Sequence, residues 1–368
     1  MNHWTNTEIS RRLNIPYPII QGPFGRGGST ALLTAAVSNA GGLGSFGAND
    51  LAPEDILKAA ADIRQLTDKP FGMNLWVSTF DKGGDTLERE TYERVAELLA
   101  PYYRELGVEI PPLPVGKARN FDDQAAALIE ACPAVFSFVF GAPSEDILRT
   151  CRQKGIVTVG AATTVDEAVF VEQAGVDLLA ASGFEAGGHR PSFLNSAEQS
   201  LIGTFALIPQ VVDKVRIPVI AAGGIADGRG IAAVLALGAS AAQIGTAFLA
   251  CDESGASDAH RRLLFGDAAK YTTLSPAYTG RPARGLDNRF AAEMKNHASL
   301  LAKYPAQSWI IAPLRAAALA AGRTDLVGLW AGQAAPLVRY HKAAELFAAL
   351  VRDAERLLGK ANTASQGN

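Results

Sequence analysis

The sequence predicts an α/β protein whose main body is a (β/α)8 barrel, with an inserted excursion and a C-terminal helical subdomain. Eight short apolar runs recur along the 368 residues, and segments with helix-start and helix-end residues lie between them. Runs this short and continuous suit strands that are buried on both faces of a parallel sheet. Repeated strand–helix alternation is typical of a closed barrel. A doubly wound open sheet is the alternative, and eight strands in sequence make it less favoured.

The expected helices start and end on residues that suit those positions. Thr164 to Glu167 places a Thr and two acidic residues at one helix start, where they satisfy free N–H groups and favour the helix dipole. Gly155 and Gly175 stand at helix ends, where glycine readily takes the left-handed conformation. The expected strands are Pro18–Gln21, Gly42–Ser45, Phe71–Trp76, Val135–Phe140, Ile156–Gly160, Asp177–Ala181, Ile217–Ala221 and Ala241–Ile244.

Two stretches do not fit the alternation. The segment between the third and fourth strands is too long for one connection and contains Pro111-Pro112-Leu113-Pro114, so we expect an insertion with its own helix near Glu88–Tyr103. After Ile244 the barrel needs only a closing helix, and the Ala-rich remainder is expected to be helical. The domains expected are therefore a barrel of residues 1–76 and 131–265, an insertion at 77–130, a helical subdomain at 266–360 near the barrel mouth, and a disordered tail at 361–368.

Composition narrows the function classes. Hydrophobic residues make up 48% of the chain and charged residues 19%, which speaks against disorder. A net charge of −3 without a Lys/Arg run speaks against a nucleic-acid partner. Cys132, Cys151 and Cys251 are far apart, and no apolar signal core or membrane-spanning stretch stands out. We expect a cytoplasmic protein with no metal site and no membrane partner.

Glycine-rich turns follow the last two expected strands. Gly223 and Gly224 come after the seventh, and Gln243-Ile244-Gly245-Thr246 ends the eighth. In barrels of this class these two loops commonly bind a phosphate, because glycines let backbone N–H groups approach an anion closely. Tight strand-to-helix turns are the alternative explanation, and two such loops on consecutive strands favour the phosphate site.

Another glycine pattern is misleading. Residues 42–47 spell Gly-x-Gly-x-x-Gly, the pattern of a dinucleotide-binding turn. That turn must follow a strand and open a helix, with an acidic residue at the end of a second strand. Here a helix is expected to precede the glycines, and Asp62 falls within a helix. The pattern therefore does not indicate a dinucleotide site.

His189 is the strongest candidate for a catalytic residue. It lies a few residues beyond the sixth expected strand, in a glycine-rich turn with Gly187 and Gly188, on the face where the phosphate loops lie. Imidazole titrates near neutral pH and suits proton abstraction. Asn74, late in the third strand, and Gln21, at the end of the first, are either pocket residues or structural amides, and spacing alone does not decide between these roles.

Six segments together resemble the nitronate monooxygenase family, formerly called 2-nitropropane dioxygenase, within the FMN-dependent TIM-barrel superfamily. The resemblance covers about residues 15–290 and keeps the order and spacing of all segments. These segments are Ile20–Pro23, Ala35–Gly44, Phe71–Leu75, Glu185–His189, Ala221–Ile225 and Gln243–Phe248. The departures are Pro23-Phe24-Gly25-Arg26-Gly27-Gly28, where many relatives carry Met-Ala-Gly, Ser182, where many carry Gln, and an insertion at 78–130 that is longer than usual.

The resemblance implies FMN at the barrel mouth and His189 as the active-site histidine. It places the other candidate residues around the flavin: Gln21, Gly22, Asn74, Ser182, Gly187, Gly223, Gly224, Gln243, Gly245 and Thr246. The implied reaction oxidises an alkyl nitronate, or a nitroalkane, with O2 to a carbonyl compound and nitrite. A homodimer is one possible assembly, and Arg281 or Arg284 is a candidate for contact with an anionic substrate, with a solvated loop as the alternative.

Two other functions stay open at this point. The first is an FMN-dependent NAD(P)H reductase of quinones or enoyl thioesters, because such enzymes share much of the motif set. The second is a flavin-binding barrel without turnover. The presence of His189 in its glycine-rich loop argues against the second. Glu185 either orients His189 or caps its loop, and the sequence does not decide between the two.

Overall fold

The computed structural model describes residues 3–77, 86–113 and 120–364. Eight parallel strands form one sheet in the order β1-β9-β8-β6-β5-β4-β3-β2. The Gln21 N–H donates to the Leu43 carbonyl at 2.9 Å and the Leu43 N–H to the Ile19 carbonyl at 3.0 Å, which joins the first and last strands of that order. The sheet is therefore a nearly closed barrel, and the predicted fold class is confirmed.

Each predicted barrel strand is present with small shifts at its ends. Ile20, Leu43, Leu178 and Ile220 fill the inside of the barrel, and Ile9 and Leu13 of α1 (Glu8–Leu13) belong to the same buried cluster. The barrel strands are β1 (Ile19–Gln21), β2 (Gly44–Gly47), β3 (Phe71–Trp76), β4 (Val135–Val139), β5 (Val157–Ala162), β6 (Leu178–Ser182), β8 (Val219–Ala222) and β9 (Ala241–Ile244).

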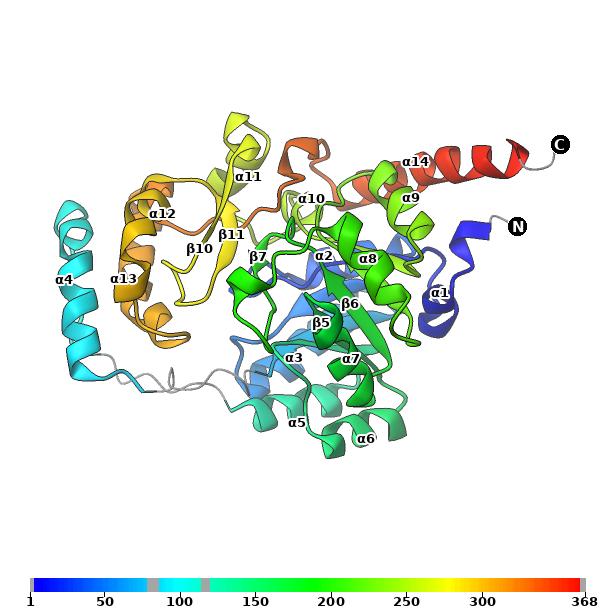
Figure 1. The fold of residues 1–368 in the computed structure, drawn as a ribbon, viewed down its shortest axis with the longest axis horizontal. Coiled ribbons are helices and arrows are strands. Elements are labelled where there is room, and N and C mark those ends of the chain that lie inside the picture. Colours follow the sequence, from blue (N-terminus) through cyan, green and yellow to red (C-terminus); the bar gives the residue numbers. More distant parts are fainter. Residues whose placement is uncertain (1–2, 78–85, 114–119, 365–368) are drawn as a thin grey trace.

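Helices surround this sheet (Figure 1). The ones that alternate with strands are α2 (Ala31–Asn39), α3 (Pro53–Leu66), α5 (Phe121–Ala131), α6 (Glu145–Gln153), α7 (Val165–Gln173), α8 (Thr204–Val212) and α9 (Gly228–Ala236). Only the short α10 (Thr246–Leu249) follows β9 directly. The place between α9 and α2 is filled by α14 (Ala343–Ala364), so the expected closing helix comes from the far end of the chain.

The C-terminal region is largely helical, as expected, but it also contains two strands that the sequence analysis did not predict. Strands β10 (Thr272–Ser275) and β11 (Ala283–Leu286) pair antiparallel, and β11 also pairs with β7 (Gly188–His189). His189 therefore lies in a short strand. The remaining helices are α11 (Asp258–Leu264), α12 (Arg289–Met294), α13 (Ala306–Ala320) and the 3-10 helices His3–Thr5, Ala197–Gln199, Asp267–Lys270, Lys295–Leu300, Thr324–Leu326 and Ala335–Leu337.

The two helices in the described part of the insertion pack in different places. Helix α5 packs on α3 and β3, as a barrel helix does, whereas α4 (Arg89–Glu105) packs against α13 and lies at the opposite end of the molecule from the chain termini (Figure 1). We therefore propose that only the part before α5 is an excursion, and that α14 belongs with the barrel. Of the expected tail, residues 361–364 continue α14, and residues 365–368 lie outside the described residues.

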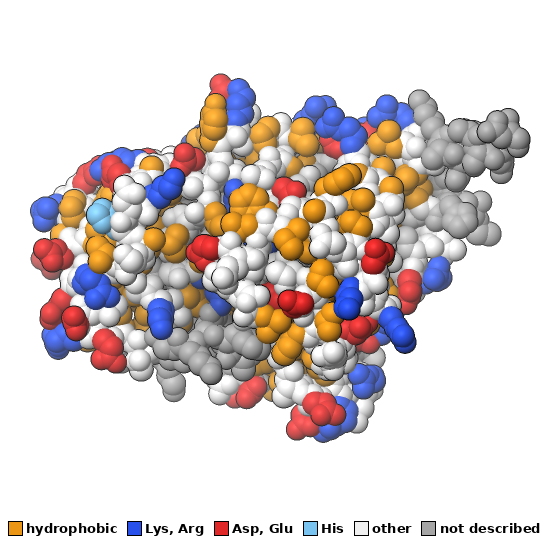
Figure 2. Space-filling model, viewed as in Figure 1, with side chains coloured by type: hydrophobic (Ala, Val, Ile, Leu, Met, Phe, Trp, Pro, Cys, Tyr) orange, Lys and Arg blue, Asp and Glu red, His pale blue; other side chains and the backbone are white. Residues whose placement is uncertain are grey.

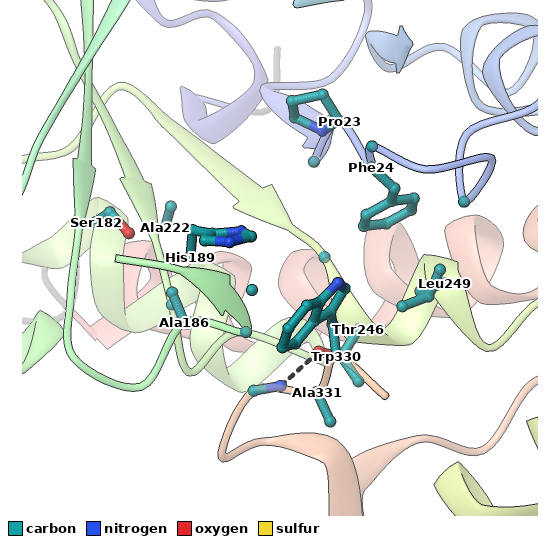
Figure 3. Close-up of a pocket in the computed structure, with 18 of the residues that line it drawn as sticks. Pro23, Phe24, Ser182, Ala186, His189, Ala222, Thr246, Leu249, Trp330 and Ala331 are labelled. Carbon is teal, nitrogen blue, oxygen red and sulfur yellow. Dashed lines mark hydrogen bonds between the residues drawn. The ribbon is translucent and has the colours of Figure 1, made fainter. Parts of the chain in front are cut away.

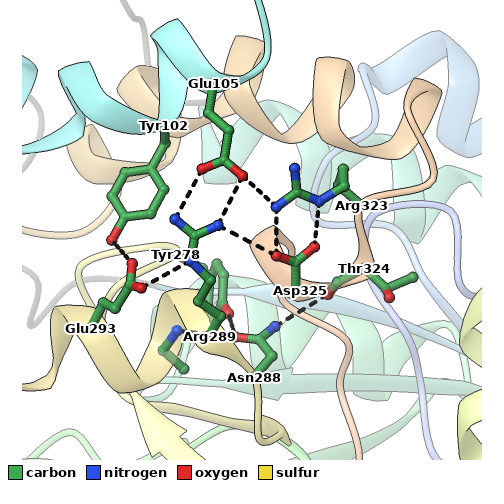
Figure 4. Close-up of polar contacts among 10 residues, drawn as sticks. Tyr102, Glu105, Tyr278, Asn288, Arg289, Glu293, Arg323, Thr324 and Asp325 are labelled. Atoms are coloured by element: carbon green, nitrogen blue, oxygen red, sulfur yellow. Dashed lines mark hydrogen bonds and ion pairs between the residues drawn. The ribbon is translucent and has the colours of Figure 1, made fainter.

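A polar network fastens α4 to the C-terminal region (Figure 4). The Glu105 carboxylate accepts two hydrogen bonds from Arg289, at 2.8 and 2.9 Å, and one from Arg323 at 2.6 Å. These hydrogen bonds lower the pKa of Glu105 to about 2. The Tyr102 hydroxyl donates to Glu293 at 2.5 Å. Because the network is partly exposed, it orients α4 more than it stabilises the fold.

On the face drawn in Figure 2, acidic and basic side chains are intermixed, and no extended area carries only one sign of charge. Within the described ranges, no helix is long and apolar enough to cross a membrane.

Candidate active site

One cavity of about 390 Å³ lies at the carboxyl ends of the barrel strands (Figure 3). Its volume is within the range of small-molecule sites, roughly 300 to 1,000 Å³. The barrel loops form most of the wall, and the C-terminal segment 328–334, residues 255–257, His260 of α11, and Arg315 and Leu319 of α13 also contribute to it. The residues singled out from the sequence that line the cavity are Gly22, Asn74, Ser182, Gly187, His189, Gly223, Gly224, Gln243, Gly245 and Thr246.

Gln21 lies one layer away from the cavity. Its side chain is fully buried, its Oε1 accepts the Ser45 N–H at 2.9 Å, and its Nε2 donates to the Gly22 carbonyl. The amide thus joins β1 to β2, and it does not line the cavity. Asn74 does line the cavity, and its Nδ2 donates to Ser137 at 3.0 Å. That bond orients the Asn74 amide from the side of β4.

The loop after β8 requires glycine for conformational reasons. Gly223 has φ +102° and Gly224 has φ +72°, values that L side chains rarely adopt. A Cβ at Gly224 would also lie 3.4 Å from the Glu185 Cβ. The loop exposes its backbone to the cavity and leads to Asp227, the N-cap of α9, whose side chain accepts the Arg229 N–H at 2.9 Å. This is a suitable cradle for an anionic group.

Glu185 supports this loop and does not contact His189. Its carboxylate accepts the Thr204 N–H at 2.8 and 3.0 Å and so caps α8, whose own N-cap residue is a glycine. The Thr204 hydroxyl lies 2.8 Å from Glu185 and 2.9 Å from the Gly223 carbonyl oxygen. Glu185 therefore links the β6 loop, the start of α8 and the β8 loop, which answers the question that the sequence left open.

The C-terminal segment 328–334 was not predicted to reach the cavity. A Cβ at Gly187 would lie 2.6 Å from the Gly332 nitrogen, so the two backbones are in direct contact. The Gly332 N–H donates to the Thr246 hydroxyl at 2.9 Å, and the Gln333 N–H donates to the Glu185 carbonyl at 2.9 Å. Gly187 thus permits close packing of another segment of the chain. Two glycines in 328–332 were the only sequence signal for this wall.

Aromatic rings surround His189. The ring of Trp76, at the end of β3, lies 5.0 Å from the imidazole, that of Trp330 lies 5.5 Å away, and Tyr304 and Phe140 are slightly farther. The imidazole is partly buried and lines the cavity among these rings, so its charged form is poorly solvated. Burial, with smaller contributions from Arg26 and Arg281, lowers the pKa of His189 to about 3. His189 is therefore neutral at physiological pH.

His260 is a second histidine in the cavity wall. Its Nε2 lies 3.1 Å from the Trp330 carbonyl oxygen, and burial lowers its pKa to about 4. Like the segment 328–334, it was not expected from the sequence to line the cavity, because its neighbours lie far away along the chain.

The two lowered histidine pKa values predict a loss of stability in mild acid. The unfolded chain takes up these protons near pH 6.5, whereas the folded chain resists until about pH 4 for His260 and about pH 3 for His189. The free energy of unfolding should therefore fall between pH 6.5 and pH 4.5. His260→Gln keeps an N–H donor but cannot titrate, so urea unfolding of this variant should show a weaker pH dependence. His297→Gln is the control, and an equal effect of both substitutions would contradict the assignment.

Two arginines that line the cavity escaped the sequence analysis. Arg26, in the β1–α2 loop, donates to Ser308 of α13 at 2.9 Å. Arg315 of α13 has no hydrogen bond or ion pair within the described ranges, and burial, together with the nearby Arg26, lowers its pKa. Arg281 and Arg284 do not line the cavity: Arg281 lies over the Phe140 ring at 3.9 Å, and Arg284 over the Phe184 ring at 4.2 Å.

The sequence and the fold both match known proteins. The family model described as nitronate monooxygenase matches residues 6–353. The chain belongs to the nitronate monooxygenase family. It is 38% identical, over 96% of its length and 99% of the relative, to a protein named probable nitronate monooxygenase from Staphylococcus haemolyticus. A relative of the same name from Staphylococcus aureus is 37% identical over 96% of the chain and 99% of the relative.

Solved structures agree with this family assignment. Nitroalkane oxidase from Streptomyces ansochromogenes superposes with a TM-score of 0.86 at 38% identity, covering 97% of this chain and 99% of that one. FabK from Thermotoga maritima is more distant, with a TM-score of 0.73 at 29% identity, covering 98% and 99%. Nitronate monooxygenases are flavin-dependent oxidoreductases, and this chain is an enzyme of that class.

Proposed function

We propose that this enzyme binds FMN at the barrel mouth and oxidises alkyl nitronates with O2 to a carbonyl compound and nitrite. The observation that carries the proposal is one cavity that joins a glycine cradle for a phosphate to a neutral histidine, with two arginines in the wall. When bound, the flavin supplies the electron acceptor and the reaction with oxygen. The chain's own residues supply binding, orientation and exclusion of water.

The residues present fit a flavin monophosphate. The backbones of Gly223, Gly224, Gly245 and Thr246 would hold the phosphate, because a side chain at either positive-φ glycine would fill the cradle. Gly22, Asn74, Ser182 and Gln243 would face the flavin ring and ribityl chain. A single cradle suits a mononucleotide better than a dinucleotide. Gln21 would act indirectly, by bracing the strand that carries Gly22.

The electrostatics of the cavity favour an anionic substrate over a neutral one. Arg26 and Arg315 both line the cavity, and burial first and then the positive charge of Arg26 lower the pKa of Arg315, whereas Asp50 raises it. An anion bound near these guanidinium groups offsets the cost of burying the charge of Arg315. A nitronate carries a full negative charge on its nitro oxygens, whereas the parent nitroalkane is neutral. The enclosed aromatic surroundings strengthen this attraction by keeping water away.

Arg315→Leu should therefore raise KM for a nitronate, by roughly 5- to 50-fold for the loss of one charge-assisted contact. KM for the neutral nitroalkane should change less. The measurement is steady-state kinetics on both substrates at low and high salt. Arg104→Leu, at an exposed position on α4, removes the same charge far from the cavity and is the control. An equal rise for both substrates would show that Arg315 acts on cavity shape rather than on charge.

One experiment separates the proposed oxidation from the alternative reductase activity. The flavin-loaded enzyme is mixed with NADH or NADPH without oxygen, and its oxidation of a nitronate is assayed in parallel. Slow or absent bleaching of the flavin together with rapid nitrite formation supports the proposal. Rapid bleaching without nitrite formation would identify an NAD(P)H-dependent reductase instead.

A further inference from the structure

The Thr279 hydroxyl contacts the imidazole of His189. Thr279 is fully buried, and its Oγ1 lies 2.9 Å from His189 Nε2. The hydroxyl also donates to the Arg281 carbonyl at 3.0 Å and accepts the Arg281 N–H at 3.3 Å. A hydroxyl has one proton, and the bond to the Arg281 carbonyl uses it. With this proton on the Arg281 carbonyl, the Thr279 oxygen is available as the acceptor for a protonated His189 Nε2.

We propose that Thr279 is a positioning residue that holds His189 in its Nε2–H tautomer and so reserves the Nδ1 lone pair for the α-proton of the substrate. This rests on the proposed function, because it assigns His189 a proton to accept. Thr279 is not among the residues that line the cavity, whereas His189 is. Within the described ranges, Nδ1 has no hydrogen-bond partner, so it is the ring nitrogen that a ligand can reach.

Backbone pairing and close packing hold the main chain on both sides of this contact, and so fix the position of the Thr279 hydroxyl. His189 pairs with Ala283 in the β7–β11 ladder, and Ala283 is only four residues after Thr279 in the chain. This pairing holds the main chain of His189 close to that of Thr279. The Thr279 N–H donates to the Pro276 carbonyl at 3.2 Å. The next residue, Gly280, has φ +83°, and a Cβ there would lie 2.4 Å from the Ala302 carbonyl oxygen. The turn therefore has little freedom to move Thr279 away.

Within the described ranges, the hydrogen bond to Thr279 is the one that the His189 ring makes, and it therefore decides the tautomer. Trp76 and Trp330 lie beside the imidazole and present mostly ring carbon. With Nε2–H bound to Thr279, the α C–H bond of a nitroalkane breaks, its proton goes to Nδ1, and the electron pair is delocalised onto the nitro group. The imidazolium keeps its Nε2–H on Thr279, and the new Nδ1–H faces the nitronate just formed. The opposite tautomer would present Nδ1–H and could not accept this proton.

The first test reads the tautomer directly, in substrate-free protein labelled with 15N-histidine. The His189 signals are assigned by their absence in His189→Asn. We expect a protonated Nε2 and an unprotonated Nδ1 at pH 7 in the wild type. In Thr279→Val, which keeps the shape of the side chain but removes the acceptor, a fraction with protonated Nδ1 should appear. Thr279→Ser should restore the wild-type spectrum. A proton on Nδ1 in the wild type would overturn the proposal without any variant.

The second test is kinetic. Thr279→Val should lower kcat/KM for a nitroalkane by roughly 2- to 10-fold relative to its nitronate, the factor that one ordinary hydrogen bond contributes. Thr279→Ser should recover most of that ratio. Flavin content and melting temperature are measured alongside. An unchanged substrate ratio in a folded, flavin-loaded Thr279→Val would overturn the proposal. If the wild type oxidised no nitronate, the proposed function would fail, while the spectra would still report the tautomer.

Discussion

Gly224→Val should yield a folded protein that has lost nearly all its flavin. The position has φ +72°, a conformation that costs about 1–2 kcal/mol for an ordinary residue and more for a β-branched one. The new side chain would also crowd the Glu185 Cβ, 3.4 Å from the position of the added Cβ, and occupy the cradle proposed for the phosphate. We expect flavin affinity to fall by at least about 100-fold, which corresponds to about 3 kcal/mol.

The measurement is flavin absorbance per protein, with identification of the released cofactor by chromatography. Gly359→Val is the matched control, because Gly359 lies in α14 and a Cβ there meets nothing within 4 Å. It should retain wild-type flavin content. A fully loaded Gly224→Val enzyme would show that the phosphate is bound elsewhere. Release of FAD in place of FMN from the wild type would refute the single-phosphate cradle.

His189→Asn should affect a neutral nitroalkane far more than its nitronate. General-base catalysis contributes about 10²- to 10⁴-fold, so kcat/KM for the nitroalkane should fall by that factor if the wild type uses it. The nitronate has already lost its α-proton, and only positioning is removed. The pKa of about 3 makes His189 a weak base in the free enzyme. The negative charge that develops on the substrate beside it stabilises the imidazolium and so favours proton transfer.

This lowered pKa also predicts the pH profile. His189 stays unprotonated throughout the neutral range, so the nitroalkane kcat/KM should not drop near pH 6.5, where an ordinary histidine base would lose activity. Kinetics from pH 5 to 8 on both substrates, with flavin occupancy measured in parallel, tests both expectations. His297→Asn is the control. Equal losses on the two substrates would make His189 a binding residue, and loss of flavin would make it structural.

Local patterns in the sequence were enough to locate the barrel. Each buried strand is a short apolar run, and glycines or helix-capping residues stand at the ends of each run. Both signals can be recognised from a few consecutive residues. Gly223, Gly224, Gly245 and Thr246 could be placed on one face because parallel strands bring their carboxyl ends to the same side of the sheet. The same rule located His189. These residues line the cavity because all of them follow the carboxyl ends of parallel barrel strands, which lie at the same end of the barrel.

The rest of the site was decided by contacts between distant parts of the chain. Strand β11 pairs with β7, Gly332 packs on Gly187, and α14 completes the helical ring. The short segment Thr272–Ser275 becomes a strand because it pairs with β11. Its own residues show no alternation of apolar and polar side chains that would indicate this pairing.

The sequence by itself therefore determined the barrel, its two glycine-rich loops and the position of the histidine, since these follow from local periodicity and from parallel-sheet topology. Only the tertiary structure decided what surrounds them. It showed that Glu185 braces a loop, that Arg26 and Arg315 bring positive charge to the cavity, and that Thr279 binds the histidine. Burial, charge balance and hydrogen-bond direction depend on residues that meet only after the chain has folded.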